Sequence, residues 1–265
     1  MQRLNKTFAE LKKQNRKALI TFITAGDPNL NATCDLVDTL VAAGADIVEL
    51  GVPFSDPLAD GPTIQAASTR SLAQGTTLKK IIATVKEIRR RTEVPLVLMT
   101  YYNPLYHYGL EKLVRDAVAV GVDGLIVPDL PLEESVELRL LAAEKLAIIP
   151  LAAPTTPADR LAEIVTAGSG FLYYVTVTGI TGTRTVLPEE LSNSLDRVKK
   201  IAGPLPLAAG FGISTPEQAR TVGAHADAVI VGSALVEIVS RHGASASGRD
   251  QLSERVKALR RALDA

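Results

Sequence analysis

The chain is organised around residues 46–65, DIVELGVPFSDPLADGPTIQ. This stretch opens with strand-forming residues and then becomes rich in proline and glycine, which predicts a short strand followed by a loop. Because side chains alternate along a strand, Val48 and Leu50 share one face while Ile47 and Glu49 share the other. One face of the strand is therefore apolar, and the other carries a carboxylate near the strand's C-terminal end.

The loop after this strand adds further polar groups beside Glu49. Three prolines stiffen it, and it carries Ser55, Asp56 and Asp60. A carboxylate in a buried strand costs several kcal/mol unless it is partnered or protonated. From this strand alone, Glu49 is either a structural carboxylate with satisfied hydrogen bonds or a functional group.

Composition and length bound the class of protein. At 265 residues, 46% hydrophobic and 22% charged, the chain can bury a large core, and we expect one domain over residues 1–265. Basic and acidic residues balance at 29 each, which suggests neither a nucleic-acid nor an anionic-membrane partner. Cys34 is the one cysteine, which indicates a reducing compartment. The N-terminus lacks a signal-peptide core and no run is long enough to span a bilayer, so we expect a cytoplasmic protein.

A strand–helix unit recurs along the chain. Periodicity predicts strands at 18–25, 46–51, 95–101, 123–128, 147–152, 170–177, 205–210 and 226–232. It predicts helices at 2–14, 30–43, 76–91, 110–120, 133–145, 157–167, 189–201, 215–222, 234–241 and 250–263. Several helix ends share a glycine followed by a small or acidic residue and a strand, as at Gly44, Gly121, Gly168 and Gly223. At Gly44 we expect a left-handed cap.

Eight apolar strands that alternate with helices predict an α/β fold, a (β/α)8 TIM barrel with an extra N-terminal helix. An open doubly wound sheet is the alternative, although no GxGxxG follows the first strand. In a barrel of this kind, chemistry lies at the C-terminal ends of the strands and in the loops that follow them. The prediction places there Glu49, Asp60, Phe22, Tyr101, Asp129, Tyr173, Gly210 and Gly232.

The loops after the seventh and eighth strands are rich in glycine. They read Ala209-Gly210-Phe211-Gly212-Ile213 and Val231-Gly232-Ser233-Ala234. Barrel loops at these two places often bind phosphate through main-chain N–H groups and a helix N-terminus. Neither loop holds lysine or arginine, so the prediction is main-chain anion binding. Ser214 and Glu217 are spaced as a capping box for the next helix, with Pro216 inside its first turn.

Two further groups cluster at the same end. The segment 176–185, rich in glycine and threonine, follows the sixth strand and is typical of a mobile lid, or else of a surface connection. All six tyrosines fall at two strand ends and their loops: Tyr101, Tyr102, Tyr106, Tyr108, Tyr173 and Tyr174. Aromatic residues grouped near an opening favour a ligand or a partner protein, while core packing is the default for Tyr174.

Absent residues narrow the chemistry. No lysine lies in a predicted strand, which removes the usual nucleophile of a Schiff-base aldolase. The three histidines are scattered and none ends a strand, so we expect no metal site. No GxSxG or reactive-cysteine setting is present. A pair of carboxylates beside a phosphate site remains, which suits proton transfers on a phosphorylated small molecule.

Several sequence motifs of this chain resemble those of one known protein family. The run VELGVPFSDPLADGPTIQ resembles the signature of the tryptophan synthase alpha subunit, and YYVTVTGITGTR, AAGFGIS, MTYYNP and IVPDLP resemble further blocks of that family. The resemblance covers about residues 5 to 240, with Thr176 where serine is expected. It implies a (β/α)8 barrel that splits indole-3-glycerol phosphate into indole and glyceraldehyde 3-phosphate by a retro-aldol reaction in tryptophan biosynthesis.

The resemblance also assigns roles to residues. Glu49 would shuttle protons, and Asp60 would accept the indole N–H. The substrate pocket would hold Phe22, Ile64, Tyr101, Ile126, Tyr173 and Thr181. Phosphate would be bound by Gly182, Phe211, Gly212, Gly232 and Ser233. Glu49 among apolar side chains is expected to have a raised pKa.

The resemblance further implies partners. The chain would need no cofactor or metal of its own and would join a beta subunit, which carries pyridoxal phosphate, in an α2β2 complex. Candidates for the contact face are Pro53, Phe54, Asp56, residues 102–108 and the 178–185 segment. Two other functions stay open: a phosphate-binding isomerase or epimerase, and a non-catalytic barrel that regulates its partner.

Overall fold

The computed structural model describes residues 1–176, 189–210 and 212–265. In this part of the chain nine strands form one sheet in the order β5-β4-β3-β2-β1-β9-β8-β7-β6, and every paired neighbour is parallel. The strands are β1 (Ala18–Thr24), β2 (Ile47–Gly51), β3 (Leu96–Met99), β4 (Gly124–Ile126), β5 (Ala147–Ile149), β6 (Leu151–Ala152), β7 (Leu172–Val175), β8 (Leu207–Gly210) and β9 (Ala228–Val231).

The predicted strand at 147–152 is bent at Pro150, and this bend closes the sheet. Its first half, β5, pairs with β4, and its second half, β6, pairs with β7. Proline has no N–H to donate, so the ladder is interrupted there. The Pro150 carbonyl still accepts a hydrogen bond from the Tyr173 N–H at 2.9 Å. Both ends of the ordered sheet thus belong to one bent strand, which confirms the predicted TIM barrel.

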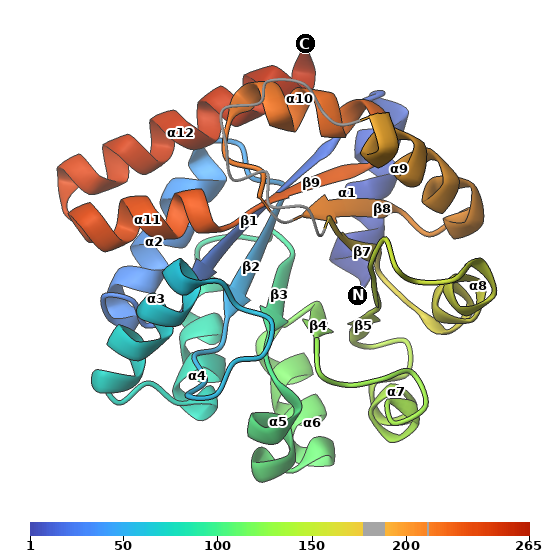
Figure 1. Cartoon of the computed structure of the whole chain (residues 1–265). Coiled ribbons are helices and arrows are strands. Elements are labelled where there is room, and N and C mark those ends of the chain that lie inside the picture. The colour runs from blue at the N-terminus through green and yellow to red at the C-terminus, as the bar shows by residue number, and fades with distance from the viewer. Residues whose placement is uncertain (177–188, 211) are drawn as a thin grey trace.

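Helices surround the strands (Figure 1). They are α1 (Gln2–Lys13), α2 (Leu30–Ala42), α3 (Pro62–Ala73), α4 (Leu78–Ile88), α5 (Tyr102–Tyr108), α6 (Leu110–Val120), α7 (Val136–Ala142), α8 (Ala158–Ala167), α9 (Glu189–Ala202), α10 (Pro216–His225), α11 (Ser233–His242) and α12 (Ala246–Asp264).

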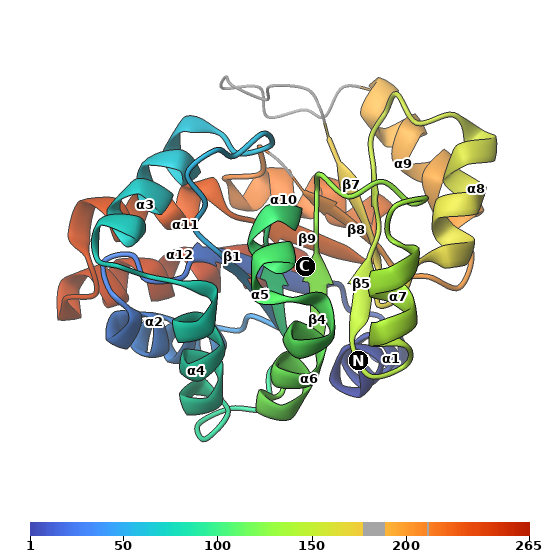
Figure 2. The ribbon, with the colours of Figure 1, turned by 90° about the horizontal axis from the view of Figure 1, so that it is seen from below.

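The extra N-terminal helix α1 covers the N-terminal ends of the strands. Leu4, Phe8 and Leu11 are buried in the same cluster as the residues that fill the barrel. The ring of Phe8 lies 5.8 Å from that of Phe171, directly before β7. In Figure 2 the start of α1 lies next to the turn that joins α7 to β5, where the N-terminal amine donates to the Lys145 carbonyl at 3.3 Å. The opposite end of the barrel is left to the βα loops.

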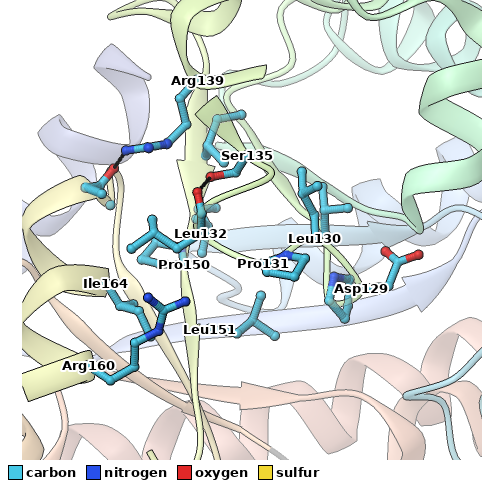
Figure 3. A pocket seen from close by; sticks show the side chains of 16 residues that line it. Asp129, Leu130, Pro131, Leu132, Ser135, Arg139, Pro150, Leu151, Arg160 and Ile164 are labelled. Atoms are coloured by element: carbon cyan, nitrogen blue, oxygen red, sulfur yellow. Dashed lines mark hydrogen bonds between the residues drawn. The ribbon is translucent and has the colours of Figure 1, made fainter. Parts of the chain in front are cut away.

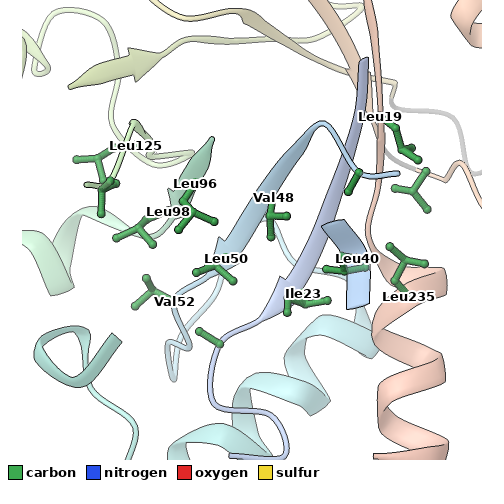
Figure 4. Packing of buried hydrophobic residues seen from close by; sticks show 14 of the residues in the cluster. Leu19, Ile23, Leu40, Val48, Leu50, Val52, Leu96, Leu98, Leu125 and Leu235 are labelled. Atoms are coloured by element: carbon green, nitrogen blue, oxygen red, sulfur yellow. The ribbon is translucent and has the colours of Figure 1, made fainter. Parts of the chain in front are cut away.

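Alternation along the strands separates two hydrophobic clusters. Val48 and Leu50 belong to the larger one, between strands and helices, part of which is shown in Figure 4. Ile47 belongs to the smaller one inside the barrel, and Glu49 shares its face, as predicted. Burial of a large aliphatic side chain contributes about 1.5–3 kcal/mol. A register slip of one residue would put Glu49 into the outer cluster, so the apolar face specifies where the carboxylate points.

Aspartates at strand starts tie the N-terminal end together. Asp46, Asp123 and Asp227 each accept a backbone N–H from the first or second residue of the neighbouring strand, at 2.8 to 3.0 Å. Asp123 also accepts from Arg89 Nη2 at 2.6 Å and from Arg3 Nη1 at 3.3 Å. Asp46 and Asp123 follow the helix-ending glycines Gly44 and Gly121, so this acidic residue has a structural role at the N-terminal ends of the strands.

Two helices were not predicted from the sequence. Residues 62–73 form α3, which starts with Pro62 at a position where its missing N–H costs nothing. Residues 102–108, predicted as a loop, form the short helix α5, whose first N–H donates to both oxygens of Asp129 at 2.8 and 3.1 Å. Both lie in βα connections, where proline and tyrosine residues hid the helical pattern.

Two details of α10 correct the expectations, and one at Gly44 agrees with them. The capping box of α10 is made by Thr215 and Gln218, one residue later than the predicted Ser214–Glu217 pair. Helix α10 continues through Gly223 to His225, so that glycine does not end it. A side chain at position 223 would lie 2.7 Å from Leu263 of α12, so glycine lets the two helices pack closely. Gly44 has φ +105°, the positive φ expected at that helix end.

Candidate active site

Glu49 lies in the interior of the barrel, on the inner face of β2. It pairs in register with Phe22 of β1 and Val97 of β3, and its side chain is 0% exposed. Neither carboxylate oxygen has a hydrogen-bond partner among the described residues. Burial, and secondarily the nearby Asp60, raises the pKa of Glu49 from 4.5 to about 8. At neutral pH this side chain is mostly a neutral acid that can give a proton and take one back.

Asp60 approaches from the loop after β2. It is half-buried, and burial raises its pKa, while a hydrogen bond from the Tyr101 hydroxyl opposes that rise. The Tyr101 oxygen also accepts the N–H of Ala59 at 3.0 Å, and its ring lies 5.3 Å from Phe54. Tyr101 thus fastens this loop to the end of β3, which holds Asp60 over the barrel.

A cavity of about 330 Å³ joins the two carboxylates, at the C-terminal ends of the strands. This size is within the ordinary range for small-molecule sites. Its walls are mainly apolar, and Glu49 and Asp60 are the acidic groups among its described lining residues. The lining comprises Phe22, Glu49, Leu58, Ala59, Asp60, Gly61, Ile64, Met99, Tyr173, Gly212, Ile213, Ser214, Ile230, Gly232, Ser233 and Ala234.

Two strand-end glycines make room for the aromatic walls. A side chain at Gly51 would lie 2.5 Å from the Phe22 ring, and one at Gly210 would lie 2.9 Å from the Tyr173 hydroxyl. Both distances are below van der Waals contact. Burial, followed by the nearby Glu49 and Asp60 charges, raises the pKa of Tyr173 far above its usual value, so its phenol stays protonated.

The far end of the cavity is built from main chain. Helix α11 begins at Ser233, directly after Gly232, so the N–H groups of its first turn face this end. Gly212, with φ +78°, lines the same end. No lysine or arginine is among the described residues that line the cavity. A helix N-terminus without cationic side chains suits an anion held by main-chain N–H groups, as the glycine-rich loops predict.

The structure brings together eight of the predicted site residues in this one cavity: Glu49, Asp60, Phe22, Ile64, Tyr173, Gly212, Gly232 and Ser233. Two others do not line it. Tyr101 lies behind the Asp60 loop, and Ile126 is fully buried in the inner cluster, next to Met99. Thr181, Gly182 and Phe211 lie outside the described residues, as does the 178–185 segment.

Sequence reasoning missed some lining residues. Met99 lies two positions after Val97, which pairs with Glu49, so strand alternation places it on the inner face. Ile230 faces inward in β9 for the same reason. Leu58, Ile213 and Ser214 come from loops, where no periodic signal exists that could have identified them.

The mouth of the barrel carries exposed apolar groups. Leu58 is 84% exposed and Tyr106 is 67% exposed. The rings of Tyr102 and Tyr106 lie 6.2 Å apart on α5. Within the described residues, no group of histidine, cysteine or acidic side chains could hold a metal ion, and no helix is long and apolar enough to cross a membrane.

Comparisons with known proteins agree with this geometry. The family model described as "Tryptophan synthase alpha chain" matches residues 8–264. The tryptophan synthase alpha chain of Geotalea daltonii is 50% identical over 269 residues, covering 100% of both chains.

Solved structures agree as well. Tryptophan synthase subunit alpha from Legionella pneumophila superposes with a TM-score of 0.91 at 38% identity, covering 99% of this chain and 98% of that one. A chain of the tryptophan synthase a2b2 complex from Pyrococcus furiosus superposes with a TM-score of 0.86 at 40% identity, covering 92% and 98%. The chain therefore belongs to the tryptophan synthase alpha chain family.

Proposed function

We propose that this chain is the lyase that cleaves indole-3-glycerol phosphate into indole and glyceraldehyde 3-phosphate, with Glu49 as the proton carrier. The observation that carries the assignment of Glu49 is its burial without a partner among the described residues, at the apolar end of a cavity whose other end suits a phosphate. A neutral acid in such a place has the proton affinity that acid–base chemistry near neutral pH requires.

The reaction needs one proton given and one taken. Glu49 donates its proton to indole C3, and the ring becomes an electron sink. The resulting carboxylate takes the proton of the side-chain hydroxyl as the bond between C3 and the carbinol carbon breaks. The bonding electrons return to the indole ring, the hydroxyl becomes the aldehyde of glyceraldehyde 3-phosphate, and Glu49 is again protonated. No lysine, metal or cofactor of this chain takes part.

Other residues bind and orient the substrate. Asp60 accepts the indole N–H and stabilises the positive charge that develops on the protonated ring. Phe22, Ile64 and Tyr173 pack against the indole. The phosphate lies at Gly212, Gly232 and Ser233, with Gly182 and Phe211 completing its site. Thr181 contributes to the substrate site. Anchoring the phosphate at one end holds C3 within reach of Glu49 at the other.

The experiment is to incubate the purified chain with indole-3-glycerol phosphate and to measure both products. Wild type should release indole and glyceraldehyde 3-phosphate in equal amounts. Asp60→Asn should lower the rate about 10²-fold or more, since a charge that stabilises the transition state is removed. Glu10→Gln, an exposed carboxylate on α1, serves as the matched control and should react like wild type. An isomerised sugar phosphate, or no product with the partner present, would contradict the assignment.

The family's partner is a beta subunit, and we propose an α2β2 assembly in which that subunit carries pyridoxal phosphate. A relative of this chain is part of the tryptophan synthase a2b2 complex of Pyrococcus furiosus. The exposed Leu58 and Tyr106, with Pro53, Phe54 and Asp56, form the proposed contact face. Adding the beta subunit should raise the cleavage rate, and Leu58→Ser should weaken that activation. We also propose that the protein is cytoplasmic, because its single cysteine indicates a reducing compartment.

A further inference from the structure

A second cavity lies on the outside of the barrel, between α7 and α8 (Figure 3). Its volume is about 340 Å³, close to that of the active-site cavity, and no described residue lines both. We call it the α7–α8 cavity. The residues that matter to its chemistry are Asp129, Pro131, Arg139, Pro150, Arg160 and Ile164.

The bent strand and a proline-rich loop create this space. At Pro150 the strand turns from β4 toward β7, and the loop Pro128-Asp129-Leu130-Pro131 lines the same space. Gly168, at the end of α8, packs so closely that a side chain there would lie 2.4 Å from the Pro150 ring. The walls are thus rigid proline rings and aliphatic side chains, which favour a preformed pocket over one that closes when empty.

The two arginines of the cavity differ in how they are neutralised. Arg160 donates to both oxygens of Glu133 and to Glu163 at 3.0 Å. Arg139 makes one long hydrogen bond, from Nη1 to the Ala167 carbonyl at 3.4 Å. Within the described chain, no carboxylate lies in ion-pairing range of Arg139, and its buried Nε–H has no acceptor. A half-buried guanidinium in this state lacks the partner that buried charges normally have.

The hydrogen-bond donors of Arg139 that have no partner indicate which kind of ligand the cavity binds. Because Nη1 donates to Ala167 and the Nε–H is enclosed, Nη2 is the group left to donate to an oxygen of a bound carboxylate, in a charge-assisted hydrogen bond. Beyond Arg139 the cavity is apolar across Pro131, Pro150 and Ile164. Asp129 lies at the other end of the view in Figure 3 and disfavours a second negative group there. We propose that the α7–α8 cavity binds a small monocarboxylate with an apolar, aromatic or aliphatic body.

This site is separate from the active site but close to it. Pro128 and Leu151 line the α7–α8 cavity and also a shallow hollow at the barrel mouth, which shares Ala59 and Met99 with the active-site cavity. Leu151 pairs with Tyr173 in the sheet. The α7–α8 cavity and the active-site cavity therefore both border this hollow. The proposal does not depend on which reaction the active site performs.

The test uses hydrocinnamate as the probe, with hydrocinnamyl alcohol as its neutral match, on the whole chain. Titration calorimetry should show one saturable site for the acid and binding at least tenfold weaker for the alcohol, the loss expected for a charge-assisted hydrogen bond. Isoleucine methyl NMR locates the probe. Signals of Ile148 and Ile164 should shift, while those of Ile64 and Ile230 in the active site should not.

Variants distinguish the contribution of the Arg139 charge to binding from that of the shape of the cavity. Arg139→Met, which keeps the apolar stem, should weaken hydrocinnamate about tenfold or more and leave the alcohol unchanged, and Arg139→Lys should restore part of the loss. Ile164→Trp should block both probes by filling the cavity. Arg115→Met, an exposed arginine on α6, is the matched control.

Equal affinity for acid and alcohol, equal binding in Arg139→Met, or methyl shifts confined to Ile64 and Ile230 would each overturn the proposal. If Arg139→Met fails to fold, the comparison of acid with alcohol on wild type and the Ile164→Trp variant still decide it.

Discussion

Replacing Glu49 by glutamine should make the fold more stable relative to wild type as pH rises. The pKa of Glu49 is raised from 4.5 to about 8, so the folded state holds this proton more tightly than the unfolded chain. Each tenfold change in proton affinity corresponds to about 1.36 kcal/mol, and ionising Glu49 therefore costs the folded state about 5 kcal/mol. The contribution of the carboxyl to stability is complete below pH 4.5 and is lost as pH rises through 8.

Urea unfolding of wild type and Glu49→Gln, repeated from about pH 5 to about pH 9, measures this effect. The difference between their free energies of unfolding should grow by about 4 kcal/mol over that range, in favour of the glutamine variant. The glutamine amide also lacks partners, but that cost does not depend on pH. The free energy of unfolding of Glu10→Gln, a substitution at an exposed site, should change with pH in the same way as that of wild type. A wild-type and Glu49→Gln difference that stays constant with pH would refute the raised pKa and the reasoning behind it.

Three further substitutions test how the barrel holds the site. Gly51→Ala places a methyl 2.5 Å from the Phe22 ring, so thermal unfolding should show a loss of about 1–3 kcal/mol in the free energy of unfolding, and a stability equal to that of wild type would contradict the packing. Asp123→Ala leaves the buried Arg89 unpaired and should cost about 3–5 kcal/mol in urea unfolding; a cost below 1 kcal/mol would count against that ion pair. Thr77→Ala removes the cap of α4 and should cost about 1 kcal/mol, with no change expected in cleavage.

The fold was predictable because its repeat is strong. Apolar strands alternate with helices along the whole chain, aspartates precede three of the strands, and the structure has the predicted parallel barrel. Helices α3 and α5 were not predictable, since Pro62 and the tyrosines of α5 break the apolar period on which such predictions depend. The bend at Pro150 was also hidden, because a strand that changes partners looks like one continuous strand in sequence.

The residues of the candidate site were predictable where they lie on strands. Glu49 and Phe22 face the same cavity because strand parity dictates it, and Met99 could have been added by the same rule. Residues contributed by loops, such as Ile213, depend on contacts between distant segments and leave no periodic trace. Tyr101 was predicted to line the pocket, but it fastens the loop that carries Asp60 and does not line the cavity itself.

The central claim is that one buried carboxyl carries the protons of the cleavage, and the turnover number of Glu49→Gln tests it most directly. Wild type and variant are compared at saturating indole-3-glycerol phosphate, with circular dichroism to show that both are folded. Glutamine has nearly the same shape but can neither give nor take the proton, so the account predicts a loss of at least about 10²–10⁴-fold. A folded Glu49→Gln enzyme that keeps a rate within tenfold of wild type would contradict it.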